Sequence, residues 1–275
     1  MLSVNTNTGA MVALQYLNQT NGQLQNVQNA INTGMKVAGP KDDGATFAIA
    51  QNMRGDVAGF GAVTDSLNRG MSAVDVALSG GQSISDLLIQ MKQKALAASD
   101  SSLDTASRAA LNEDFAALRD QIASVVTNAT FNHFNLIDGS VTAGITALAS
   151  ADGQHRITVG SEDMSLGGSV VTVDATGTIS SQTAASTMVS TIETSLTNVD
   201  ASLARLSSGS KKFSIQAEFV TKLSDALTTG IGNLVDANMA TESARLQSLQ
   251  VKQQLGVQAL AIANQAPSIA LSLFR

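Results

Sequence analysis

The sequence contains no cysteine and no tryptophan in its 275 residues, and it has only two prolines. The absence of cysteine excludes a disulfide framework, a thiolate nucleophile and the common structural zinc sites. Charged residues make up only 14% of the chain, compared with roughly 25% in an average globular domain. Because 44% of the residues are hydrophobic and proline rarely interrupts them, the chain can form long helices around a core.

The net charge of −6 excludes whole classes of partner. Binding of nucleic acid through its phosphates needs a clustered basic surface, which an acidic chain of low charge density does not offer. No apolar run reaches the 18 residues that a membrane-spanning helix needs, so we expect no membrane insertion. The segment MLSVNTNTGAMVALQYLNQ lacks a basic start, a continuous apolar stretch and a cleavage site, and we therefore expect no cleaved secretory signal.

Charge is scarcest at the two ends of the chain. Residues 1–35 contain no charged side chain, and residues 246–275 contain only Lys252 and Arg275. Within the first segment, apolar residues recur at spacings of three, four and seven, with Asn or Gln in most gaps, which predicts an amphipathic helix that ends near Gly34. The apolar residues of this helix include Leu14, Leu17, Leu24, Val27 and Ile31.

The last helix is expected from about Asn238 to Ile262 or beyond, and its apolar residues form two lines. The first line comprises Leu246, Leu249, Val257 and Leu260, and the second comprises Val251, Leu255 and Ile262. One interpretation is a helical hairpin buried within the monomer. The alternative is that these residues pack between subunits, because pairing with a single N-terminal helix would leave apolar surface uncovered.

The middle of the chain predicts long helices with one β element. A heptad pattern runs from residue 47, breaks at the capping sequence SDSSLD (99–104), and resumes from 111 to 125. Residues 131–182 contain alternating β-branched residues and Gly turns, typical of two to four short antiparallel strands, and a helical pattern returns over 188–234. We therefore expect a mainly α fold, in which the N- and C-terminal halves form a long antiparallel coiled-coil rod carrying a small β-hairpin subdomain.

This order predicts two discontinuous domains. Residues 1–38 and 238–275 form a domain of terminal helices, which we expect at the inner core of any assembly. Residues 39–237 form a rod domain that contains the β-hairpin insert at 139–182.

No catalytic or cofactor site emerges from the pattern. His133 and His155 are the only histidines, and they lack the spacing of a metal motif, so they are expected to be solvated or turn residues. The pair Ser208 and Lys211 has the spacing of a serine-lysine nucleophile but none of its partner motifs. The acidic dipeptide at 42–43, beside Gly and Pro, is expected to be a turn or helix N-terminus rather than a magnesium site. The sequence thus predicts a protein that is not an enzyme and binds no cofactor.

Serine and threonine are dense between residues 142 and 195. This density is explained either by ordinary β and loop composition or by a surface that carries O-linked sugars. The candidate acceptors for O-glycosylation are Thr142, Thr146, Thr172, Thr176, Thr178 and Ser180.

Three segments resemble bacterial flagellin, especially the short flagellins of α-proteobacteria. They are NTNTGAMVALQYLN (5–18), INTGMKVAGPKDDGATFAIAQNMRGDV (31–57) and NLVDANMATESARLQSLQVKQQLGVQALAIANQAPSIALSLFR (233–275). The resemblance covers residues 1–135 and 185–275, and the C-terminal segment is its most specific part. The sequence departs from the family at FNHFNLIDG, where His133 follows Phe-Asn in place of the usual glycine.

The resemblance implies a structural subunit that polymerises into the flagellar filament used for swimming. In that family the paired terminal helices form a coiled coil around a central channel. The subunit is secreted through the flagellar type III export apparatus, usually with a flagellin chaperone on its C-terminal helix, and it folds under a cap at the tip of the extracellular filament. The expected partners are therefore many copies of the same chain, the cap and hook-associated proteins, the chaperone and the export apparatus. The alternative is a hook-filament junction protein, which shares the terminal helices.

Overall fold

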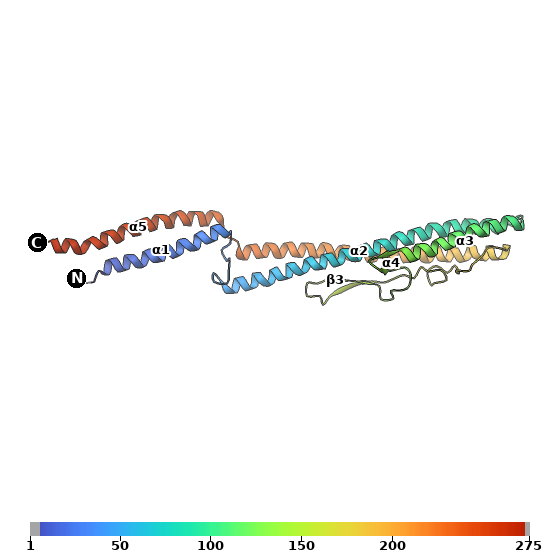
Figure 1. Ribbon diagram of the computed structural model, residues 1–275, viewed down its shortest axis with the longest axis horizontal. Coiled ribbons are helices and arrows are strands. Elements are labelled where there is room, and N and C mark those ends of the chain that lie inside the picture. The colour runs from blue at the N-terminus through green and yellow to red at the C-terminus, as the bar shows by residue number, and fades with distance from the viewer. Residues whose placement is uncertain (1–5, 273–275) are drawn as a thin grey trace. The chain divides into compact units, whose positions relative to one another are not determined.

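The computed structural model describes residues 6–272, and the side chains of residues 6–265. The chain divides into two compact units. One consists of residues 1–55 and 226–275, and the other of residues 56–225. Each unit is built mainly from helices that lie far apart in the sequence, as Figure 1 shows.

The first unit contains the two terminal helices, α1 (Thr8–Thr33) and α5 (Met239–Ser272), which lie side by side (Figure 1). The side chain of Asn7 caps α1 by accepting a hydrogen bond from the Ala10 amide. The helix ends at Gly34, whose φ of 71° is the left-handed conformation that glycine adopts without strain. Asn238 caps α5 in the same way by accepting from the Thr241 amide at 3.2 Å.

A compact joint connects the helices of the first unit. The Lys36 amide donates to the Val235 carbonyl at 2.7 Å, and the Ala237 amide donates to the Gly34 carbonyl at 2.9 Å. Val37, Ala50 and Val235 form a small buried core beneath these bonds. The two connectors of the unit are therefore held to each other by backbone hydrogen bonds as well as by apolar packing.

The second unit is organised around α3 (Thr105–Asn128) and the parts of two longer helices, α2 (Gly44–Ala98) and α4 (Gln182–Val235), that fall within residues 56–225. Within this unit, Gly70 of α2 faces the ring of Phe213 on α4, while Gly81 faces Leu203. Because the residue numbers along α4 fall as those along α2 rise, the two helices are antiparallel. The helix α3 turns back along α2, and Lys94 forms an ion pair with Asp114 at 2.6 Å.

Burial confirms one of the two lines of the heptad pattern predicted for α2, whereas the other line, with Thr64, Met71 and Leu78, is only half-buried. Phe60, Leu67, Val74 and Leu88 are buried, as the spacing requires. A further line of buried residues also recurs every seven positions on α2: Val63, Gly70, Ala77, Ile84, Met91 and Ala98. This further line was missed because several of its residues are too small to register as apolar, although their size permits close approach of the neighbouring helices.

Two short antiparallel hairpins follow α3. The strands β1 (Thr130–Phe131) and β2 (Phe134–Asn135) form one, and β3 (Ile145–Leu148) pairs with β4 (Arg156–Val159) in the other. The turn of the first hairpin consists of Asn132 and His133, both at positive φ (48° and 65°). This is the combination that a type I′ turn requires, and it explains why glycine is the usual residue at the position of His133.

Strands were expected within residues 131–182, and for the part GGSVVTVDATGTI (167–179) this expectation is wrong. This segment contains no strand, yet Val171, Val173 and Ile179 are buried. Its amides bond to helix side chains instead, since the Ile179 amide donates to Asn112 Oδ1 at 2.8 Å. The β-branched residues here pack as an extended segment against the helices and not in a sheet. Helix side chains accept the backbone hydrogen bonds that a neighbouring strand would otherwise accept.

The observed elements confirm a mainly α fold with antiparallel long helices and a small antiparallel β subdomain. The division at 38 and 238 remains a prediction. None of the described helices is both long and apolar enough to cross a membrane.

Candidate assembly surface

The terminal helices α1 and α5 pack along a narrow seam. Val27 and Leu249 are buried in it, and Leu17 lies against Gly256, where a Cβ would stand 3.3 Å from Leu17 Cδ1. Polar bonds extend along the pair: Asn7 Nδ2 donates to the Ala263 carbonyl at 2.7 Å, and Gln253 Nε2 donates to Asn21 Oδ1 at 2.8 Å. Amide side chains thus connect the helices without any buried charge.

The structure separates the twelve predicted packing residues into two groups. Seven are buried or half-buried within the chain, and these are Leu17, Leu24, Val27, Ile31, Leu246, Leu249 and Leu260. Five are exposed, and these are Leu14, Val251, Leu255, Val257 and Ile262. The interpretation of a hairpin buried within the monomer therefore describes only one face of the pair.

The exposed group has a regular arrangement on α5. Val251, Leu255 and Ile262, which we call the outer row, follow each other at spacings of four and seven and so share one face of the helix. At 3.6 residues per turn this face lies opposite the seam residues Leu249 and Leu260. Ile262 is 70% exposed and Leu255 is 58% exposed. Val257 was expected in line with Leu249, but it lies at the flank of the seam and is exposed.

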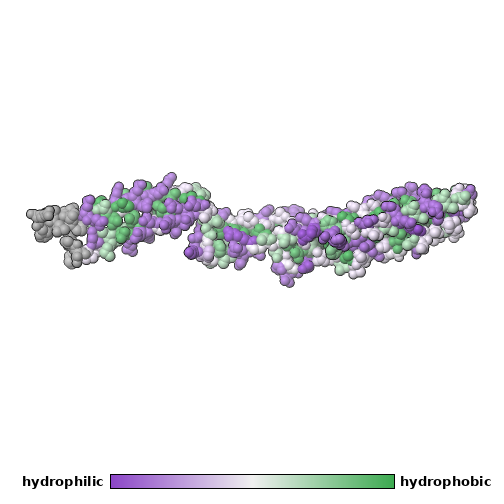
Figure 2. All heavy atoms as spheres, viewed as in Figure 1, coloured by the Kyte–Doolittle hydropathy of each residue, from purple (hydrophilic) through white to green (hydrophobic). Residues whose placement is uncertain are grey.

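Further exposed apolar residues on α1 were not predicted as part of a packing surface. Met11, Val12 and Tyr16 are at least half exposed. A partial signal for them was present, because Met11 belongs to the apolar spacing of this helix, three residues before Leu14. Figure 2 shows apolar surface alternating with polar surface along these helices. The pair therefore presents more apolar surface than a monomeric hairpin would normally leave in water.

The residues considered for catalysis are not arranged for it. Among the described residues, no group of three His, Asp or Glu side chains could hold a metal ion, and His133 and His155 are exposed. Ser208 and Lys211 are both exposed, without a hydrogen bond between them. Asp43 caps α2 by accepting hydrogen bonds from the Ala45 and Thr46 amides. The hydrogen bond from the Thr46 hydroxyl, followed by those from the two amides, lowers the pKa of the Asp43 carboxyl. The acidic dipeptide is thus a helix N-terminus.

All six candidate acceptors for sugars are exposed, but only three of their hydroxyls are hydrogen-bonded to other described residues. The Thr146 hydroxyl bonds to that of Thr158, Thr172 bonds to Ser195, and Thr176 donates to Asp174. The hydroxyls of Thr142, Thr178 and Ser180 make no hydrogen bond to another described residue.

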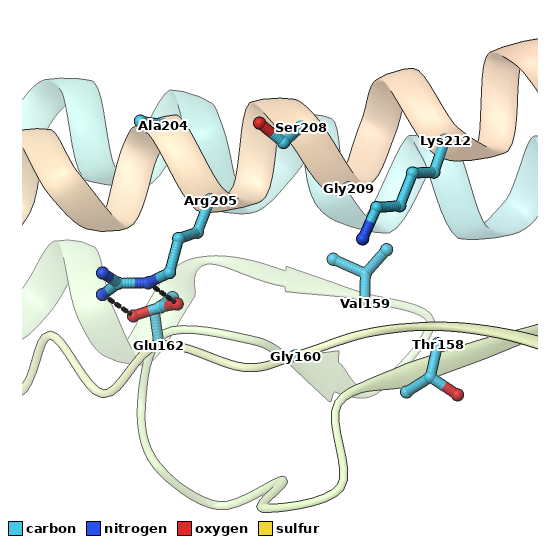
Figure 3. Close-up of a pocket in the computed structure, with 9 residues that line it drawn as sticks. All are labelled: Thr158, Val159, Gly160, Glu162, Ala204, Arg205, Ser208, Gly209 and Lys212. Carbon is cyan, nitrogen blue, oxygen red and sulfur yellow. Dashed lines mark hydrogen bonds and ion pairs between the residues drawn. The ribbon is translucent and has the colours of Figure 1, made fainter.

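An ion pair fastens the segment after β4 to α4. Arg205 Nε and Nη2 each donate to Glu162 at 2.6 Å (Figure 3). The Ser202 hydroxyl donates to the same carboxylate at 3.0 Å. Burial alone would raise the pKa of Glu162, but the bonds from Arg205 and Ser202 outweigh it and lower this pKa. Lys212 reaches toward Val159 beside this pair in Figure 3, so the small groove between β4 and α4 has a cationic rim.

The comparisons with known proteins cover nearly the whole chain. Residues 4–142 match the bacterial flagellin N-terminal helical region, and residues 189–274 match the bacterial flagellin C-terminal helical region. Flagellin FljK of Caulobacter vibrioides is 54% identical over 99% of this chain and 98% of its own length. A flagellin of Brucella melitensis is 35% identical over the full length of both chains.

Among solved structures, a putative flagellar hook-associated protein from Vibrio parahaemolyticus aligns with a TM-score of 0.54. It covers 71% of this chain and 100% of its own, at 13% identity, and this likeness supports the fold alone. The full-length flagellin relatives do not favour the alternative of a hook-filament junction protein. The chain belongs to the bacterial flagellin family, and it is therefore a structural subunit that polymerises into the flagellar filament and not an enzyme.

Proposed function

We propose that the outer row of α5, together with Met11 and Leu14 of α1, forms the contact between terminal-helix pairs of neighbouring subunits in the filament. The observation that carries this proposal is the position of the outer row, which lies opposite the seam and is uncovered by the chain itself. A single hairpin needs one apolar face on each helix. A second face indicates a second neighbour, and repetition of one heterologous contact generates an open helical polymer.

The scarcity of charge supports the same arrangement. Among residues 1–35 and 246–265, Lys252 is the only charged side chain. When identical helices are stacked many times around an axis, any uncompensated charge meets copies of itself at each step, and the repulsion accumulates. Neutral Asn and Gln side chains avoid this cost and provide a polar wall for the channel that the family implies.

We further infer the partners and the location that belong to such a subunit. The chain is exported through the flagellar type III apparatus, with a chaperone covering the apolar faces of α5 until the subunit assembles under the filament cap. The completed filament is extracellular, joins hook-associated proteins at its base and serves swimming. O-linked sugars, where present, occupy Thr142, Thr178 or Ser180, because these exposed hydroxyls are not engaged by other described residues.

Deletion of residues 246–275 tests the proposed assembly surface. The truncated protein retains the whole second unit and should keep its helical circular dichroism and cooperative unfolding, yet it should form no filaments under negative-stain electron microscopy. The full-length protein in the same buffer is the control. Filaments from the truncated protein would contradict the proposal, and intact mass measurement of native filaments decides separately whether sugars are present.

A further inference from the structure

The second unit has a groove on the side of the β3–β4 hairpin that faces α2. It is lined by Ser66, Arg69, Phe131, Phe134, Ile145 and Thr146. Phe134 is 48% exposed although it is a large aromatic residue. Three apolar side chains therefore line part of the groove, and the chain leaves about half of Phe134 uncovered.

The groove also contains an uncompensated cation. Arg69 makes no ion pair or hydrogen bond with any described residue, although Asp65 lies one turn earlier on α2. The guanidinium groups of Arg108, Arg119 and Arg205 are hydrogen-bonded, whereas the side chain of Arg156, like that of Arg69, makes no bond with a described residue. An apolar lining beside a free guanidinium fits an occupant that presents apolar side chains next to a carboxylate.

The α4 helix carries an apolar strip with that composition. Ile215 and Phe219 are four residues apart, so they form adjacent knobs on one helix face, and both are more than half exposed. Glu218 directly precedes Phe219, and among the described residues it pairs with Lys222 alone, one turn away on the same helix. Exposed pairs of this kind contribute about 0 to 1 kcal/mol, so Glu218 can readily exchange Lys222 for another cation.

The groove and the strip lie on different sides of the hairpin. The groove is bounded by α2 and β3, whereas α4 runs beneath β4, where Gly209 contacts Val159. Neither surface can therefore reach the other within one subunit. When two complementary surfaces face different sides of a molecule, each can be covered by a different neighbouring copy, and repetition of that heterologous contact adds copies head to tail.

We propose that the groove of one subunit receives Ile215 and Phe219 of a second copy of this chain, with Glu218 of that copy paired to Arg69. The contact rests on the polymerisation of the family, and it assigns a specific pair of surfaces to the second unit. It is separate from the proposed contacts of the terminal helices.

Disulfide trapping tests the contact directly, because the native chain has no cysteine. Two single variants, Thr146→Cys in the groove and Glu218→Cys in the strip, are mixed, polymerised and oxidised. Peptide mass spectrometry should find the 146–218 disulfide in mixed filaments but not in unpolymerised protein. Thr127→Cys, at an exposed site on α3, replaces the groove variant in a matched control and should give little or none of this product, because a disulfide needs Cα atoms within about 7 Å.

A charge exchange provides a second test that does not depend on cysteine. Arg69→Glu and Glu218→Arg should each raise the critical concentration for polymerisation about tenfold, as expected when one strong interface contact is lost. The double variant R69E/E218R should restore most of it, since every contact then regains opposite charges. The melting temperature of the monomer should change little in all three, because both side chains are exposed and an exposed pair such as Glu218–Lys222 contributes little to stability.

Normal filaments without the 146–218 disulfide would overturn the contact, and so would a double variant no better than its parents. Either result would leave the assignment to the flagellin family intact. If a cysteine variant fails to polymerise, the charge exchange alone decides between the two outcomes.

Discussion

Replacement of Leu255 by glutamine isolates the contribution of the outer row to polymerisation. Leu255 is 58% exposed and lies opposite the seam, so the substitution removes little packing within the chain. Leucine and glutamine have similar helix propensities, and α5 should therefore keep its helical content. The helix loses one apolar side chain only on the surface that we assign to the neighbouring subunit.

The magnitude follows from the area that assembly would bury. Complete burial of a leucine side chain contributes about 1.5 to 3 kcal/mol. Covering the exposed part of Leu255 therefore contributes roughly 1 to 2 kcal/mol for each subunit added, which corresponds to a 5- to 30-fold change in an equilibrium constant. The critical concentration of the Leu255→Gln variant should rise by about this factor.

The assay is sedimentation of filaments from a dilution series of purified protein, with circular dichroism of the soluble fraction. Leu255→Met is the matched control, because it keeps an apolar side chain of similar volume and should polymerise nearly as well as the native chain. An unchanged critical concentration for Leu255→Gln would refute the assignment of this residue to the subunit contact. A loss of helical content in the soluble variant would show instead that Leu255 supports the monomer.

Three further predictions concern the second unit. His133→Gly should raise the melting temperature, with a gain of about 1 kcal/mol, because glycine adopts the positive φ of this type I′ turn without strain; an unchanged or lower value would contradict the turn argument. Gly209→Ala should destabilise the unit by about 1 to 3 kcal/mol in chemical denaturation, because a Cβ would overlap Val159. The control Gly61→Ala should stabilise it by about 0.5 to 1 kcal/mol, because nothing lies within 4 Å of a Cβ at that position. Glu162→Gln should lower the free energy of unfolding at pH 7. The difference from the native chain should shrink as the pH falls below about 4, because a carboxyl with a depressed pKa stabilises the fold only while it is ionised. A difference that persists in acid would exclude the Arg205 pair as its cause.

The helices were predictable because their signals are local and repeated. Heptad spacing located α2 and α4, and capping residues such as Asp104 and Asn238 marked where helices begin. The helix α2 starts at Gly44, a few residues before the predicted apolar pattern, because the cap formed by Asp43 determines the start.

What the sequence could not show depends on contacts between distant residues. The segment around Val171 has strand-like composition, but its backbone is satisfied by helix side chains such as Ser195, which no local pattern reveals. The terminal helices present the same difficulty, since the apolar spacing of Val257 resembles that of Leu249 although only Leu249 enters the seam. A spacing identifies an apolar face, whereas the partner that covers it is determined by the three-dimensional arrangement.

The most direct test of the central claim is a high-resolution electron cryo-microscopy reconstruction of the polymerised protein. The measured quantity is the exposed fraction of Val251, Leu255 and Ile262 in the filament. We predict that the side chains of neighbouring subunits cover all three, while the α1–α5 seam around Leu249 is retained within each subunit. An outer row that faces open solvent or the channel in the assembled filament would contradict the claim.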